Sequence, residues 1–149
     1  MKASLFVSCL VDQFYPEIGE SVVKVLRNLN VDLDFPSGQT CCGQPAYNSG
    51  FASRAAPLAR RALDMFSDSE YVVIPSGSCG AMLKVFTPEL FRDDPELEEE
   101  TRSLAERTYE FSQFIVNVLG VTDVGARFQG KVTYHASCHL LRELGAATE

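Results

Sequence analysis

The chain has 149 residues, of which 46% are hydrophobic, a composition typical of a globular domain with its own core rather than of a disordered segment. Its formal net charge of -7 disfavours nucleic acid as a partner, because a polyanion would be repelled. No apolar run approaches the roughly 18 residues of a membrane-spanning helix, and no signal peptide is recognisable, so we expect a cytoplasmic protein without a transmembrane segment.

The first half of the chain predicts alternating strands and helices. Residues 3–8 form a first apolar strand, and Pro16 begins an amphipathic helix, where proline suits the first turn. Residues 31–35 alternate like a second strand, and residues 51–66 carry apolar side chains at helical spacing. This order is typical of βαβ units.

The second half continues the pattern. Residues 71–75 form a short, fully apolar strand, as expected in a parallel sheet buried on both faces, and residues 76–79 turn into a helix. Residues 95–119 predict the longest helix, and residues 131–136 predict a further strand just before Cys138. We therefore predict a doubly wound α/β domain, Rossmann-like, with a mostly parallel sheet and helices on both faces.

Five cysteines are the most informative residues of the chain. They are Cys9, the adjacent pair Cys41 and Cys42, then Cys79, and finally Cys138. Each follows a predicted strand, and the carboxyl ends of parallel strands meet at one edge of a sheet, where α/β proteins bind ligands. We therefore expect these thiols to converge. An odd number of cysteines without an export signal favours reduced thiols over a disulfide framework.

Several kinds of cysteine site are disfavoured by spacing. The chain has no Cys-x-x-Cys motif of a thioredoxin or zinc ribbon, no Gly-x-Gly-x-x-Gly loop and no Walker phosphate loop. None of Cys9, Cys79 and Cys138 has the arginine six positions later that a cysteine phosphatase needs. Gly43 would let the backbone pass close to a bulky inorganic group.

Two other kinds of chemistry stay open. A zinc-binding interaction scaffold is possible, and His135 and His139, which flank Cys138, could join such a site. Thiol–disulfide chemistry by Cys41 and Cys42 is the last alternative, because a disulfide between adjacent residues is strained.

Four segments resemble a known family: residues 41–50, 75–79, 114–125 and 130–138. They are similar to the CCG, or cysteine-rich, domains found in heterodisulfide reductase, in the iron–sulfur subunits of glycolate oxidase and, most closely, in the iron–sulfur proteins of lactate utilisation. The resemblance covers essentially the whole chain. It implies a subunit of an oxidoreductase complex rather than a complete enzyme.

The resemblance also implies a cofactor and its ligands. Cys9, Cys41, Cys42 and Cys79 match the cysteines of the motif and supply four thiolates, the number that a [4Fe–4S] cluster requires, with Cys138 as a further candidate. The full family motif ends in Cys-x-x-Cys, whereas Met82 stands at that last position here. The non-cubane cluster that uses this last cysteine is therefore not expected.

The family arrangement further implies function, partners and domain boundaries. Electrons from L-lactate would pass through the cluster to other subunits of a lactate-oxidation complex, including a ferredoxin-like iron–sulfur subunit. Family members carry two modules in tandem, so residues 1–126 would be a first module and residues 127–149 the start of a second, truncated one. Such a fragment could self-associate to cover exposed apolar surface, and aerobic preparation could leave it without its cluster.

Overall fold

A four-stranded, all-parallel sheet forms the centre of the computed structural model, which describes residues 1–146. The strands are β1 (Lys2–Leu5), β2 (Asp32–Asp34), β3 (Val72–Ile74) and β4 (Thr108–Glu110), in the spatial order β2-β1-β3-β4. The register places Ser4 of β1 opposite Val72 of β3, and Val72 opposite Thr108 of β4. The predicted α/β fold with a parallel sheet is confirmed.

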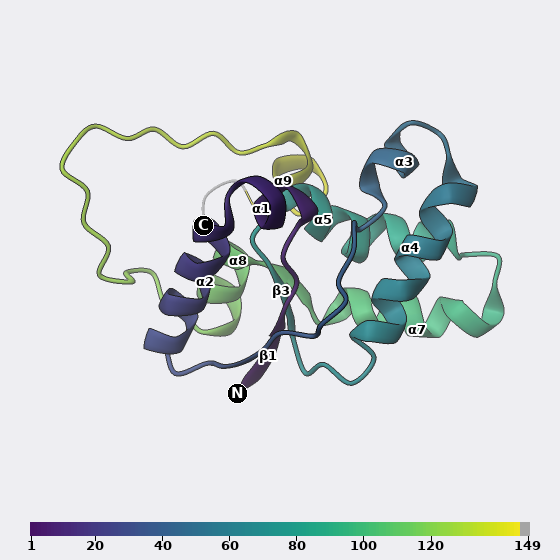
Figure 1. Cartoon of the computed structure of the whole chain (residues 1–149), viewed down its shortest axis with the longest axis horizontal. Helices are drawn as coiled ribbons and strands as arrows, with labels where there is room; N and C mark the ends of the chain where they lie inside the picture. Colours follow the sequence, from purple (N-terminus) through teal and green to yellow (C-terminus); the bar gives the residue numbers. More distant parts are fainter. Residues whose placement is uncertain (147–149) are drawn as a thin grey trace.

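One face of the sheet is covered by α2 (Pro16–Asn28) and by η2 (Phe114–Val118), a π-helical segment that continues α8 (Phe111–Gln113). Their apolar side chains pack on those of β1 and β3 in one cluster, which contains Ala3, Leu5, Val22, Leu26, Val31, Val73, Phe114 and Ile115. In Figure 1, α2 and α8 lie to the left of the strands.

The other face is covered by α4 (Ala52–Met65), α7 (Pro95–Glu106) and the π-helical turn η1 (Met82–Phe86). In Figure 1, α4 and α7 lie to the right of the strands. This second cluster includes Phe6, Phe66, Met82, Leu83 and Leu104, all nearly inaccessible to solvent. It also includes two cysteines, Cys42 and Cys79, so the core on this face extends into the region of the thiols.

The short helices gather at the carboxyl ends of β1 and β3, at the top of Figure 1. They are α1 (Cys9–Phe14), α3 (Gln44–Asn48), α5 (Gly77–Ala81) and α9 (Cys138–Arg142), while α6 (Thr87–Leu90) continues η1. Helix α1 was not predicted from the sequence. Among residues 1–146, no helix is long and apolar enough to span a membrane.

The predicted helix over residues 95–119 is wrong in its middle. Helix α7 ends at Glu106, β4 follows, and a second helical segment begins at Phe111. The apolar residues of the two helical halves explain the break, because Leu104 packs in the cluster on one face of the sheet and Ile115 packs in the cluster on the other. A continuous helix could not reach both faces, so the chain crosses the edge of the sheet as β4.

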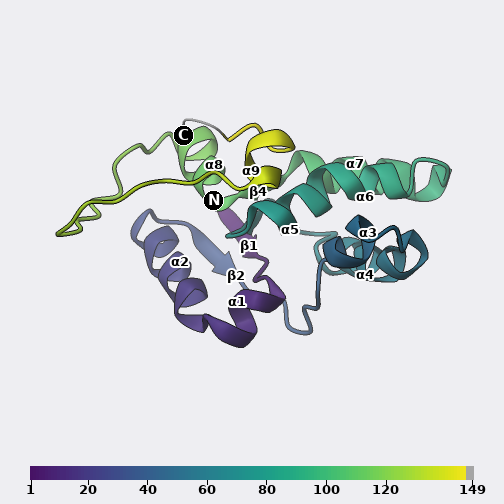
Figure 2. The ribbon, with the colours of Figure 1, turned by 90° about the horizontal axis from the view of Figure 1, so that it is seen from above.

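The predicted strand over residues 131–136 is also wrong. This segment is irregular and exposed, with Val132 and Tyr134 at 78% and 68% of their full accessibility. Its alternating pattern has no neighbouring strand to pair with, and a strand without a partner leaves its backbone groups to water. Figure 2 shows the chain before α9 as an extended irregular segment that projects from the rest of the domain. The predicted self-association of the chain, and its division into two modules, stay predictions.

Candidate functional site

Cys9 is the first residue of α1 and lies just beyond the end of β1. Ser8 caps this helix, because its buried Oγ accepts a hydrogen bond from the backbone N–H of Val11 at 3.3 Å. The cap satisfies a donor that the first helical turn leaves free. The direction of the chain at Cys9 is therefore set by the end of β1 and by the Ser8 side chain.

Gln39 holds the loop that leads to Cys41 and Cys42 against β1. Its Oε1 accepts a hydrogen bond from the N–H of Val7 at 2.9 Å, and its Nε2 donates to the carbonyl of Leu5 at 2.7 Å. The Gln39 side-chain amide thus makes the two hydrogen bonds that the backbone of a neighbouring strand would make with Val7 and Leu5. This role could not be predicted from the sequence, because a glutamine in a polar loop carries no signal that separates it from a solvated one.

Gly43 turns the chain from the cysteine pair into α3. Its φ of 89° is left-handed, and a β-carbon there would lie 3.2 Å from the carbonyl oxygen of Ala55 on α4. Close packing against α4 thus requires glycine, a different reason from the predicted approach to an inorganic group. The N–H of Gly43 also contacts Cys41 Sγ at 3.5 Å.

Cys79 is the third residue of α5, which begins directly after β3. Ser76 caps this helix as Ser8 caps α1: its Oγ accepts a hydrogen bond from the backbone N–H of Cys79 at 3.4 Å. Cys79 is buried, with 6% of its surface accessible. The sequence prediction of a turn into a helix at residues 76–79 is confirmed.

The structure brings four of the five cysteines together in two pairs. Cys42 Sγ and Cys79 Sγ are 3.2 Å apart and both residues are buried. Cys9 and Cys41 interact with each other and are half-buried. The pairs also influence one another, since Cys9 interacts electrostatically with Cys79, and Cys42 with Cys41. Four thiols lie near one another, as their positions after parallel strands predicted, whereas Cys138 is not among them.

Proton affinity differs sharply between the two buried thiols. The hydrogen bond from Cys42, followed in importance by those from Ser76 and Ser78, lowers the pKa of Cys79 to about 7 although burial opposes this. The same hydrogen bond to Cys79, together with burial, raises the pKa of Cys42. Burial and then the neighbouring Cys41 raise the pKa of Cys9. Cys79 is therefore the more acidic thiol of the pair, and Cys42 is its hydrogen-bond donor.

The donor set is suited to a soft metal or a cluster, but the sulfurs contact each other instead of surrounding a common point. Within residues 1–146, no three side chains of His, Cys, Asp or Glu are arranged to hold a metal ion. Thiolates are nevertheless the ligands that iron–sulfur clusters prefer, and zinc also binds them readily. A role of these cysteines as ligands therefore fits their chemistry and requires the Cys42 and Cys79 sulfurs to separate.

Cys138 and the two histidines are placed differently. Cys138 is exposed at the start of α9, and His135 lies in the exposed irregular segment. His139 Nε2 lies 3.4 Å from the side-chain Nδ2 of Asn48, and its ring meets the edge of Phe86 at 5.8 Å between centroids. The His139 ring therefore has an amide and an aromatic partner.

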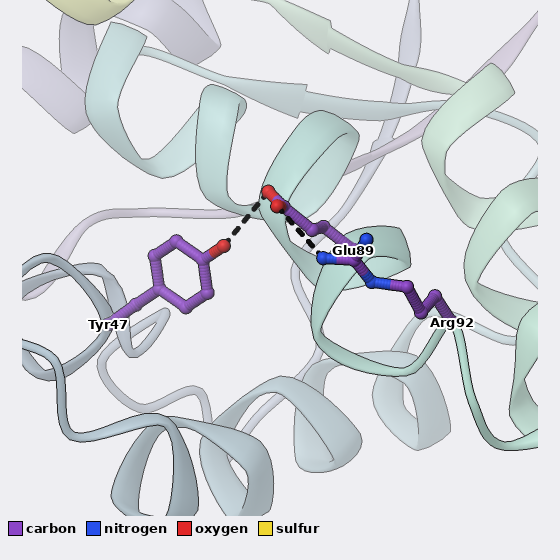
Figure 3. A network of polar contacts seen from close by, with 3 residues as sticks. All are labelled: Tyr47, Glu89 and Arg92. Atoms are coloured by element: carbon purple, nitrogen blue, oxygen red, sulfur yellow. Dashed lines mark hydrogen bonds and ion pairs between the residues drawn. The ribbon is translucent and has the colours of Figure 1, made fainter.

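A polar network, drawn in Figure 3, joins the helix after the cysteine pair to the helices after Cys79. The hydroxyl of Tyr47 donates to Glu89 Oε2 at 2.9 Å, and Arg92 Nη2 contacts Glu89 Oε1 at 3.2 Å. The Tyr47 ring also stacks on Phe86 at 5.0 Å between centroids. These contacts tie α3 to η1 and α6, and so fix the cysteine loop relative to the helix that carries Cys79.

Known proteins resemble this chain over most or all of its length. The model of the CCG cysteine-rich domain family matches residues 3–84, more than half of the chain and the part that contains the four converging cysteines. Lactate utilization protein A of Geobacillus thermodenitrificans is 55% identical over 145 residues, which are 97% of this chain and 60% of the relative. Its counterpart in Bacillus subtilis is 52% identical over 149 residues, which are 100% of this chain and 62% of the relative. The chain thus spans less than two thirds of the length of these relatives.

Proposed function

This chain belongs to the CCG cysteine-rich domain family, and from that premise we propose that it is an iron–sulfur electron-transfer module of a system that oxidises L-lactate. The names of its relatives support the part in lactate utilisation. The chemistry of four adjacent thiols supports the iron–sulfur part. The single observation that carries the proposal is the convergence of Cys42 and Cys79, which are separated by 36 residues of sequence, at a sulfur–sulfur distance of 3.2 Å.

In this proposal Cys9, Cys41, Cys42 and Cys79 hold a [4Fe–4S] cluster, whose chemistry is the acceptance and release of single electrons. The protein contributes placement and shielding. Ser8 and Ser76 cap the two helices that begin beside the site. The apolar side chains around Cys42 and Cys79 exclude water from the deep half of the site.

The half-buried pair marks the side from which we propose that electrons enter or leave. Cys9 and Cys41 line an open cavity of about 470 Å³ together with Asp12 and Phe35. We propose that a ferredoxin-like subunit or another subunit of the lactate system approaches here, in the cytoplasm, and that the chain acts as a subunit rather than as a complete enzyme.

The experiment is anaerobic reconstitution with iron and sulfide, followed by analysis of iron, sulfide and zinc and by electron paramagnetic resonance after reduction. We expect brown protein with iron and sulfide in equal amounts. Cys42→Ser should lose most of its iron, because a hydroxyl oxygen is a poor replacement for thiolate on a soft cluster.

Cys138→Ser is the matched control. Cys138 is exposed at the start of α9, outside the two cysteine pairs, so this variant should keep most of its iron. Equal loss of iron in both variants would add Cys138 to the ligands and contradict the four-cysteine set. Stoichiometric zinc without sulfide would replace electron transfer by the zinc-scaffold alternative.

A further inference from the structure

The two most deeply buried cysteine sulfurs of the chain are in contact although nothing covalent joins them. Cys42 Sγ and Cys79 Sγ are 3.2 Å apart, and the two residues expose 2% and 6% of their surface. Each is held by its own backbone: Cys42 precedes the left-handed Gly43 packed on α4, and Cys79 lies in the serine-capped turn of α5. The S–S bond of a disulfide is about 2.05 Å long, so the two sulfurs would have to approach by only about 1 Å.

The other cysteine pairs are less suited to a bond. Cys41 and Cys42 are adjacent in sequence, and a disulfide between neighbours is strained. Cys9 and Cys41 interact but are half-buried beside an open cavity, so their side chains keep more freedom. Cys138 is exposed and lies outside these pairs. Cys42 and Cys79 are therefore the pair best placed to form an intramolecular disulfide.

We propose that Cys42 and Cys79 form a disulfide in the metal-free chain when it meets a small two-electron oxidant such as hydrogen peroxide. One thiolate attacks a peroxide oxygen, the O–O bond breaks, and the sulfur becomes a sulfenic acid while the released hydroxide takes up the thiol proton as water. The second thiol attacks this sulfur, an S–S bond forms, and the S–O bond breaks to release another water. The two thiols supply both electrons.

This disulfide would prevent the metal-free site from binding iron, a consequence that rests on the proposed function. Both sulfurs are proposed cluster ligands and must separate to bind iron, so a bond between them prevents loading. Reduction by a dithiol would reopen the site. The modification would thus store the unloaded protein in a closed form, with its reactive sulfurs protected from further oxidation to sulfinic acid.

The test uses the whole chain, stripped of metal by a chelator and reduced under anaerobic conditions. After treatment with one equivalent of hydrogen peroxide, free thiols are blocked with N-ethylmaleimide and the protein is digested by trypsin without reductant. We expect residues 28–54 joined to residues 62–84, in a species that dithiothreitol separates. A main product that joins residues 3–24 to residues 28–54, or sulfinic acid at Cys79 without a link, would overturn the proposal.

Variants identify the sulfur, because Cys41 and Cys42 share one tryptic peptide. Cys41→Ser and Cys9→Ser should keep the link, and Cys42→Ser should lose it. If Cys41→Ser loses the link and Cys42→Ser keeps it, the disulfide joins Cys79 to Cys41 instead of Cys42. That result would overturn the proposal. Each variant is compared by circular dichroism, so that loss of the link is scored only in folded protein.

Iron uptake separates this proposal from the proposed function. Linked protein should lose iron uptake, and dithiothreitol should restore it. If disulfide-linked protein takes up as much iron as reduced protein, the disulfide does not block the site, and this part of the proposal is overturned. A mapped Cys42–Cys79 link in a chain that takes up no iron in either state would overturn the proposed function and leave the disulfide standing.

Discussion

Gly77 of α5 lies directly against Leu140 of α9: a β-carbon on Gly77 would be 2.7 Å from the β-carbon of Leu140 and 3.1 Å from Ser137 Oγ. Helix α9 therefore packs on the short helix that carries Cys79, although more than 50 residues separate the two in sequence. The absence of a side chain at Gly77 makes this contact possible. The segment predicted to begin a second module thus contacts the helix that carries Cys79.

Replacing Gly77 by alanine should displace α9. The added methyl group has no room against Leu140, and overpacking of this kind costs about 1–3 kcal/mol. We expect urea unfolding to show a lower stability and hydrogen exchange in residues 138–142 to accelerate, while the sheet keeps its protection. Unchanged exchange in α9 would contradict the packing of Leu140 on Gly77.

Gly19→Ala in α2 is the matched control for Gly77→Ala. The nearest atoms to a β-carbon at Gly19 are the methyl groups of Val7 and Val11 at 3.8 Å, an ordinary contact. Alanine is the better helix former there, so the variant should be as stable as the parent or more stable by roughly 0.5–1 kcal/mol.

Ser76→Ala should weaken the helix that holds Cys79. The Ser76 side chain accepts the N–H of Cys79, and loss of a capping residue costs about 1 kcal/mol. The measurement is the free energy of unfolding of the metal-free, reduced protein in urea. Ser76→Thr should recover part of the loss. Ser53→Ala, an exposed serine inside α4, serves as the control and should change the stability by less than about 0.5 kcal/mol.

The position of the cysteine site could be predicted from the sequence, because it depends only on which strand each cysteine follows. Cys9, Cys42 and Cys79 each follow a parallel strand, and the ends of such strands meet wherever the helices lie. The division of the thiols into a buried pair and a half-buried pair could not be foreseen. It depends on Gly43 packing against Ala55 and on the Gln39 side chain bridging Val7 and Leu5, which are contacts between distant segments.

The two wrong elements have a common cause. Residues 95–119 have helical periodicity on both sides of β4, and residues 131–136 alternate like a strand, so local pattern favoured both predictions. Tertiary context decided against them. Ile115 belongs to the opposite face of the sheet from Leu104, and the segment around Val132 has no strand beside it. The spacing of apolar residues indicates which side chains face inward, but not on which face of the sheet they pack.

Lys84→Met should destabilise the junction between α7 and β4. The Lys84 ammonium donates to the carbonyls of Ala105 at 2.9 Å and of Thr108 at 3.0 Å, and it lies 4.9 Å from the centre of the Tyr109 ring. Methionine keeps the apolar stem but leaves both carbonyls without this donor. Because hydrogen bonds to charged groups contribute about 1.5–3 kcal/mol, we expect a loss of about 2 kcal/mol in urea unfolding.

Lys24→Met is the control for Lys84→Met. Lys24 is exposed and its ion pair with Glu20 has a distance of 3.9 Å, so its loss should cost less than about 0.5 kcal/mol. A similar loss of stability in both variants would show that the part-buried hydrogen bonds of Lys84 to the two carbonyls contribute nothing specific.

Tyr47 should make the stability of the domain fall in alkaline solution. Burial, followed by the hydrogen bond to Glu89 and the charge of that carboxylate, raises the pKa of Tyr47 above its ordinary value of 10.0. The folded state therefore resists ionisation of this hydroxyl more than the unfolded state does. The contribution is fully present below pH 10 and is lost as the pH rises through the higher pKa of the folded state.

Tyr47→Phe tests this dependence, because phenylalanine keeps the ring that stacks on Phe86 and cannot ionise. Near pH 7 the variant should lose less than about 1 kcal/mol, since the bond to Glu89 is exposed. Above pH 10 the difference should shrink or reverse, because the parent alone gains from ionising Tyr47 on unfolding. Tyr134→Phe, in the exposed segment before α9, should follow the parent at every pH. Parallel stability curves for Tyr47→Phe and the parent from pH 7 to pH 11 would show that Glu89 and burial do not hold the Tyr47 proton.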